Sequence, residues 1–292
     1  MAVDPEELEP LVALLDDRDS VVTELVNSRL QSFGPEVVRS LRNRAERESD
    51  PVRKALVVER GKWLNTEFKL ADLQDFVTRS PGPLSLFEGS WIISSLLDWT
   101  LQRERYEDLF YRCSGEYLAE GSDQRTGVEN IRILNHIFFH RLKFTLYDVQ
   151  LRDPKYALVS DALKDRAGNP FTLSFIYLMI CQISGLSVEL LCFPGGFVPA
   201  YVEHGRILFY INLYRGGELF PQDRLEQFMK ATGLKIDKSA FRRRDESAML
   251  TLYLESLLYI YSGRKNEAMG TLLDRALTIL GPERFLTIDE AE

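Results

Sequence analysis

Apolar residues recur at helical spacing along the first part of the chain, as at Val22, Val26 and Leu30. Gly34-Pro35 follows this run in the order typical of a helix end. The pattern then predicts a helix over 36–47 and another that begins at Pro51. After Ser80–Pro83, further helices are predicted over 86–101, 106–118 and 156–166.

The spacing changes from helical to two-fold after Gly185. Before it, Gly168-Asn169-Pro170 predicts the start of a helix that is apolar on all sides through Ile183 and therefore buried. Strands are predicted over 188–193, 197–202 and 207–212, the last two as a hairpin. Pro199 predicts an edge or a bulge in the middle strand. A buried helix on a small antiparallel sheet, within an otherwise helical chain, predicts a predominantly helical α+β fold.

The two ends of the chain carry repeat-like helical patterns. The segments "LLDDRDSVV" and "ESDPVRKAL" resemble inter-helix turns of HEAT repeats, and "LYLESLLYIYSGRKNEAMGTLLDRALTILGPE" resembles a tetratricopeptide helix pair. So few repeats cannot form a solenoid or a binding groove by themselves, so both segments are expected to pack on the rest of the chain. We predict a HEAT-like segment over 1–80, a core over 81–236 and tetratricopeptide-like helices over 237–292.

Composition narrows the class of partner. Lysine and arginine number 36 against 44 aspartates and glutamates, which gives a formal net charge of −8. Such a surface repels phosphate on average, so we expect neither nucleic acid nor membrane as a partner. Arg242-Arg243-Arg244 is interpreted as a solvated patch near a helix start. The sequence starts without a signal-peptide pattern, and its cysteines are widely separated, so a cytoplasmic location is expected.

The histidines and cysteines give weak signals for chemistry. His136 and His140 stand at i and i+4 on a predicted helix, which is metal-ligand spacing, but the glutamate of HExxH is absent. With no third ligand in view, we expect core or partly buried histidines, no metal site and no cofactor. His204 is expected in an exposed turn. Cys181 and Cys192 lie in apolar runs and are expected to be inert packed thiols.

The order of the central elements resembles a known family. The stretches "AGNPFTLSFIYLMICQISGL", "FPGGFVPAYV" and "LFYINLYRGGELF", together with "LFEGSWIISSLL" and "LNHIFFHRLKF", resemble the transglutaminase-like superfamily, and more closely its bacterial SirB-type branch. The resemblance covers roughly residues 83–229 and implies a papain-like core. In catalytic members, a cysteine at a helix N-terminus works with a histidine and an aspartate on facing strands.

The resemblance places that triad on residues that cannot perform it. The cysteine position falls on Pro170, the histidine position on Gly196 and the aspartate position on Asn212. Proline and glycine supply neither a nucleophile nor a proton acceptor. We therefore expect a catalytically inactive protein that serves as a protein-binding or regulatory scaffold, with a partner that the sequence does not identify.

Two alternatives stay open at this point. One is a hydrolase or acyltransferase with relocated chemistry, using Ser174 or Thr172 with His136 or His140. The other is a peptide or small-ligand site in the vestigial cleft, where the helix N-terminus would offer free N–H groups. The residues expected to line that cleft are Asn169, Thr172, Phe197, Tyr201, Tyr210 and Tyr214.

Overall fold

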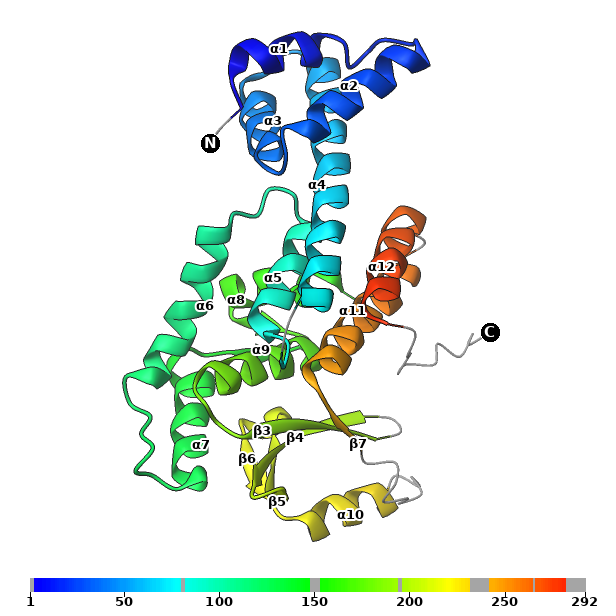
Figure 1. Ribbon diagram of the computed structural model, residues 1–292. Helices are drawn as coiled ribbons and strands as arrows, with labels where there is room; N and C mark the ends of the chain where they lie inside the picture. Colours follow the sequence, from blue (N-terminus) through cyan, green and yellow to red (C-terminus); the bar gives the residue numbers. More distant parts are fainter. Residues whose placement is uncertain are drawn as a thin grey trace. The chain divides into compact units, whose positions relative to one another are not determined.

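The computed structural model describes residues 3–79, 82–147, 153–193, 196–231, 242–264 and 266–281 (Figure 1). The chain forms two compact units, one of Met1–Thr78 with Ile92–Gln102 and the other of Arg79–Trp91 with Arg103–Glu292. The predicted division at residues 80 and 236 stays a prediction. Within the described ranges, no helix combines the length and apolarity needed to cross a bilayer.

The first unit is built on α1 (Pro5–Ala13), α2 (Ser20–Ser32), α3 (Glu36–Arg47) and α4 (Pro51–Arg79). Side chains of Asp4 and Asp19 cap the first two helices by accepting backbone N–H groups. Gly34 adopts φ +73° between α2 and α3, as the sequence predicts for a helix end. The core of this unit includes fully buried side chains from α2, α3 and α4, namely Leu30, Val37, Leu41, Val57 and Leu64.

The end of α5 (Leu86–Leu97) and the turn after it belong to this first unit. Asn65 Nδ2 on α4 donates to the carbonyl of Ser95 at 2.8 Å in a buried position. The predicted helix continues to residue 101, but the observed one stops at Leu97. Asp98 Oδ1 accepts both the N–H and the hydroxyl of Thr100, at 2.9 and 2.6 Å, and this local pairing competes with further helix.

The second unit is also mainly helical and contains the buried helix that the sequence predicts. The predicted helix over 156–166 is wrong in its first turn, because a 3-10 turn precedes α8 and Arg166 ends α8 at φ +55°. The remaining helices of this unit are α6 (Arg103–Leu118), α7 (Gly127–Asn135), the π-helix η1 (His136–Arg141), the 3-10 turns η2 (Pro154–Tyr156) and η3 (Leu213–Arg215), α8 (Val159–Asp165), α9 (Pro170–Ile183), α10 (Gln222–Ala231), α11 (Glu246–Ser262) and α12 (Glu267–Leu280).

A five-stranded antiparallel sheet lies in the second unit, in the order β6-β5-β4-β3-β7. Its strands are β3 (Val188–Phe193), β4 (Gly196–Glu203), β5 (Arg206–Asn212), β6 (Glu218–Phe220) and β7 (Arg242–Arg244). The predicted hairpin is confirmed, with His204 and Gly205 at positive φ in its turn. Arg242–Arg244 directly precedes α11, as the interpretation near a helix start requires, but the sequence did not predict that this segment pairs with Leu190–Cys192 as an edge strand.

Pro199 lies at a position of β4 that pairs with a neighbouring strand on one side only. It pairs with Leu190 of β3, whereas the pairing of β4 with β5 starts at Ala200. The missing N–H of proline is tolerated at such a local edge. Thr145–Leu146 (β1) and Ala167–Gly168 (β2), which the sequence did not predict, form a separate short parallel pair.

Helices cover the two faces of the five-stranded sheet (Figure 1). On one face, the ring of Phe197 meets that of Phe171 in α9, with centroids 5.2 Å apart. On the other face, Val198 and Tyr210 pack with Leu225 of α10. The predicted α+β architecture, with a buried helix on a small antiparallel sheet, is confirmed.

The last helix pair, α11 and α12, is anchored on this unit through α11. The hydroxyl of Tyr253 accepts a hydrogen bond from the N–H of Val159 at 3.0 Å, at the start of α8. The Tyr253 ring also stacks on Phe175 of α9, with centroids 5.0 Å apart. Asp237 and Pro282, which marked the predicted start of this region and the end of the tetratricopeptide-like pattern, lie outside the described residues.

Candidate functional site

The N-terminus of α9 is closed by the chain itself. Asn169 Oδ1 accepts the N–H of Thr172 at 2.8 Å, and Pro170, the first helical residue, has no N–H to offer. The hydroxyl of Thr172 donates to the carbonyl of Ala157 at 2.9 Å, and the hydroxyl of Ser174 donates to the carbonyl of Pro170 at 2.7 Å. The side chains of Asn169, Thr172 and Ser174 are all buried, which leaves this helix start little capacity to bind a carboxylate or amide.

Aromatic rings pack beside this helix start. Phe171 stands edge-on to Phe197 of β4 and stacks on Tyr253 of α11, with centroids 5.2 and 6.4 Å apart. Rings in such contact occupy the space where a catalytic side chain on α9 would meet one on the sheet.

The strand positions predicted for the histidine and the aspartate share one face of the sheet. Side chains alternate along a strand, and Phe197 faces α9 while Val198 faces α10, so Gly196 belongs to the α10 face. Asn212 is two residues from Tyr210 and belongs to the same face. No described hydrogen bond joins Pro170, Gly196 and Asn212. Pro194 and Gly195 of the "FPGGF" motif lie outside the described residues.

The aromatic residues predicted to line a cleft are distributed over the molecule. Tyr201 stacks on Phe209, with centroids 5.1 Å apart, on the face toward α9, whereas Tyr210 is buried against α10. Tyr214 is 60% exposed in the turn after β5. Phe197 is half-buried against Phe171. The structure therefore does not gather these four rings around one cleft.

The cysteines differ in exposure and none is paired in a disulfide. Cys181 is fully buried in α9, and burial raises the pKa of its thiol well above the ordinary value. Burial also raises the pKa of Cys113, an effect that the guanidinium of Arg166, in contact with its sulfur, partly opposes. Cys192 is half-buried in β3. A raised pKa keeps a thiol protonated and poorly nucleophilic.

The expectation that His136 and His140 are core or partly buried is wrong, because both are exposed. They lie on η1, whose wider turn is shown by the hydrogen bond from the Leu142 N–H to the Ile137 carbonyl, five residues back. Their rings are 5.5 Å apart between centroids. Within the described residues, no group of three or more histidine, cysteine, aspartate or glutamate side chains is placed to hold a metal ion. His204 is exposed in its turn, as expected.

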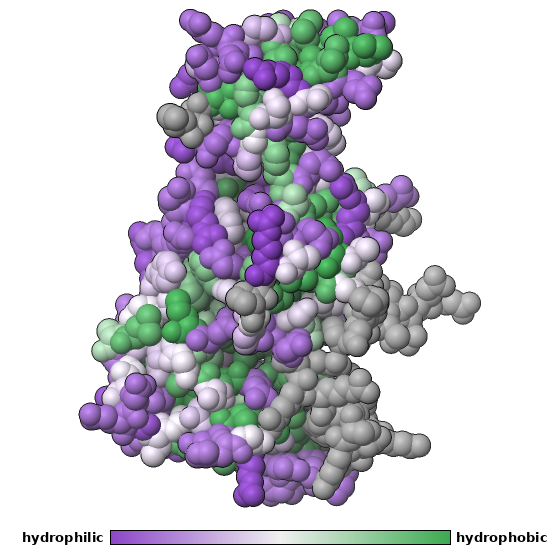
Figure 2. Space-filling model, in the orientation of Figure 1, coloured by the Kyte–Doolittle hydropathy of each residue, from purple (hydrophilic) through white to green (hydrophobic). Residues whose placement is uncertain are grey.

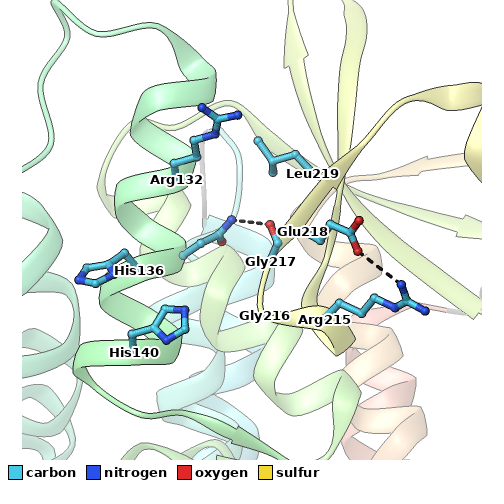
Figure 3. A pocket seen from close by; sticks show the side chains of 9 residues that line it. Arg132, His136, His140, Arg215, Gly216, Gly217, Glu218 and Leu219 are labelled. Carbon is cyan, nitrogen blue, oxygen red and sulfur yellow. Dashed lines mark hydrogen bonds and ion pairs between the residues drawn. The ribbon is translucent and has the colours of Figure 1, made fainter.

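A groove of about 450 Å³ lies between α7–η1 and the segment that joins β5 to β6 (Figure 3). Arg132, His136 and His140 line one wall, and the segment Arg215–Leu219 lines the other. Its volume is in the range of small-molecule sites. Sequence reasoning found the histidines but missed the groove, because the opposite wall is far away along the chain.

Asn135 joins the two walls of this groove at its base. Its Nδ2 donates to the carbonyl of Gly217 at 2.6 Å (Figure 3). Its Oδ1 accepts the hydroxyl of Tyr177 from α9 at 2.8 Å. Gly217 has φ +82°, and a Cβ at this position would collide with the Asn135 amide. The Gly216-Gly217 pair in "YRGGELF" is the one signal in the sequence for a special turn here.

Comparison with known proteins identifies one related family. A family model described as the transglutaminase-like superfamily matches residues 104–254, just over half of the 292 residues. The match includes α9, the five-stranded sheet and both walls of the groove. No curated protein and no solved structure matches the chain.

Proposed function

Because the chain belongs to the transglutaminase-like superfamily, we propose that it is a non-catalytic member of the SirB-type branch that acts as a protein-binding scaffold. In this proposal, the family resemblance assigns the lost cysteine, histidine and aspartate to Pro170, Gly196 and Asn212, although Gly196 and Asn212 belong to the α10 face of the sheet and Pro170 starts α9 on the other face. Function resides in a site rather than in a fold, so a chain can keep the fold after the site is lost.

The closed start of α9 is the observation that carries the non-catalytic part of the proposal. A thiol or hydroxyl nucleophile needs a base within hydrogen-bond reach. The hydroxyls of Thr172 and Ser174 instead donate to backbone carbonyls in buried positions, and the chain's three histidines are exposed. This arrangement also argues against relocated catalysis that would use these hydroxyls with His136 or His140.

Exposed apolar side chains on the first unit support the protein-binding part. Val21 and Leu25 lie one turn apart on α2 and are 62% and 65% exposed, and Val52 at the start of α4 is 69% exposed. Figure 2 shows apolar residues over these N-terminal helices. Exposed apolar groups gathered on one helix face mark contact sites between proteins. We propose that the HEAT-like helices present this contact, and that the tetratricopeptide-like pair α11–α12 caps the core.

The test is recovery of partners with the intact chain from its native cells, compared with the variant Val21→Glu/Leu25→Glu. Both substitutions lie on the exposed face of α2, so folding should persist while a partner bound through this face is lost. The matched control is Ser28→Glu/Gln31→Glu, which adds the same charge at exposed positions of the same helix. The proposal requires a partner that the control retains and the apolar-face variant loses.

A second measurement addresses catalysis directly. Alkylation of the native protein should leave partner binding intact, because no thiol takes part in it. Transfer or hydrolysis of glutamine-containing peptides should stay at the level of a protein-free blank. Loss of function on alkylation without unfolding, or peptide turnover that depends on a cysteine, would contradict the non-catalytic reading.

A further inference from the structure

The groove between α7–η1 and the β5–β6 segment concentrates cationic and imidazole nitrogen donors in an acidic protein. Arg132, His136 and His140 stand on one wall and Arg215 on the other. The net charge of the whole chain is −8, so this concentration of basic groups departs from the average surface. Guanidinium and imidazole groups that line one groove suit an anion that accepts several hydrogen bonds at once.

The donors of the first wall are unengaged within the part of the chain that the structure describes. The Arg132 side chain makes no ion pair or hydrogen bond there, and the imidazoles of His136 and His140 contact each other but have no hydrogen-bond partner. Arg141, on the same π-helix, is different, because it pairs with both Glu116 and Glu120. The first wall thus holds basic groups without a hydrogen-bonded carboxylate, while the neighbouring arginine outside the groove is paired with two glutamates.

The one acidic residue of the groove is occupied from outside. Glu218 Oε1 accepts Arg224 Nη1 at 2.7 Å. Its Oε2 forms a longer ion pair with Arg215 Nη1 at 3.8 Å, beyond hydrogen-bond length (Figure 3). The Arg215 side chain is 72% exposed. Arg215 thus shares a carboxylate that Arg224 already bonds, and its guanidinium N–H groups can still donate to an incoming anion.

The groove is held open by buried contacts. Asn135 fixes the carbonyl of Gly217 against the end of α7 and is itself held by Tyr177 of the buried helix α9. The distance between the walls is therefore set by the core rather than by the exposed side chains. A preformed site of this kind loses little conformational entropy when a ligand binds.

We propose that this groove binds the phosphate group of a small phosphate-bearing molecule. A phosphate monoester offers three terminal oxygens, enough to accept from guanidiniums on both walls and from an imidazole, whereas a carboxylate is satisfied by one arginine fork. Leu219 is the apolar residue of the lining, so recognition rests on the charged group. The assignment is independent of the scaffold role, since the apolar face of α2 belongs to the other unit.

The test is calorimetric titration of the full-length chain with phenyl phosphate, inorganic phosphate and benzoate. Phenyl phosphate and inorganic phosphate should compete for one site, and benzoate should bind at least roughly tenfold more weakly. Tighter binding of phenyl phosphate assigns the site to an organic phosphate, whereas equal binding assigns it to the free ion. Absence of phosphate binding at roughly millimolar concentration, or equal binding of benzoate, overturns the proposal.

Variants separate this groove from general electrostatic attraction. Arg132→Gln/Arg215→Gln should weaken phenyl phosphate binding roughly tenfold to a hundredfold, the effect of losing charge-assisted hydrogen bonds. His140→Gln should weaken it less. Arg141→Gln is the matched control for the single substitution Arg132→Gln, because each removes one positive charge and Arg141 lies outside the groove. All these side chains are partly or fully exposed, so the melting temperature should not change, and equal loss of binding in the control overturns the proposal.

Discussion

Replacing Asn135 with alanine removes the link between the buried helix α9 and the two walls of the groove. The Tyr177 hydroxyl, in a fully buried side chain, and the Gly217 carbonyl each lose their partner. An orphaned buried polar group costs about 1–3 kcal/mol, so the loss of two partners should lower the free energy of unfolding by about 2–6 kcal/mol. Tyr177→Phe alone orphans only the Asn135 Oδ1 and should cost about 1–2 kcal/mol.

The double variant gives the sharper result. In the double variant, neither the Tyr177 hydroxyl nor the Asn135 Oδ1 is present, so neither is left without its partner. The free energy of unfolding should therefore fall by less than the sum of the two single-variant losses, by about 1 kcal/mol or more. Urea denaturation followed by circular dichroism measures the free energies. Because the two units can unfold in separate steps, hydrogen exchange of amides over 206–220 would assign the loss to the second unit. Additive losses, or an Asn135→Ala variant within about 0.5 kcal/mol of the parent, would refute the reasoning.

Three further substitutions test other parts of the second unit. Tyr253→Phe leaves the buried N–H of Val159 unpaired and should lower the free energy of unfolding by about 1–3 kcal/mol in urea; no change would mean that α11 does not anchor α8. Gly217→Ala combines φ +82° with a collision against Asn135 and should cost at least about 1–2 kcal/mol; a neutral result contradicts the tight turn. Burial raises the pKa of Tyr117 to about 12, above the ordinary value of 10.0. The unfolded chain therefore binds fewer protons between these pH values, and stability should fall as the pH rises through that window, less steeply in Tyr117→Phe.

Sequence patterns were sufficient to predict helices and strands where the buried residues form a continuous run or alternate regularly. The bounds of α3 and β3 agree with prediction, and Asn169-Pro170 correctly marks the start of the buried helix α9. The apolar run after it predicts a buried helix, since a helix without a polar face has to be covered by other elements on all sides. Asp98 shows the limit at helix ends, because whether its side chain caps a turn or faces solvent depends on local pairing.

Elements that depend on contacts distant in sequence were not predictable. Three arginines have no strand pattern, and Arg242–Arg244 becomes β7 because Leu190–Cys192 offers an unpaired edge. The groove depends on a hydrogen bond from Asn135 to Gly217, 82 residues away. A helical pattern does not distinguish an α-turn from a π-turn, so the exposure of His136 and His140 was also missed.

The π-turn that carries the two histidines has a consequence for the evolution of this family. A π-turn holds one residue more than an α-turn, and deleting one residue within His136–Arg141 would let α7 continue as a regular α-helix. Because the wider turn accommodates that extra residue, side chains beyond it would keep their direction around the helix axis, and the rearrangement would be confined to the turn itself. The spacing of the two histidines would change, while Arg132 and Asn135, which precede the turn, would stay in place. Loss or gain of a single codon can therefore rearrange the imidazoles of this wall without disturbing its arginine or the core.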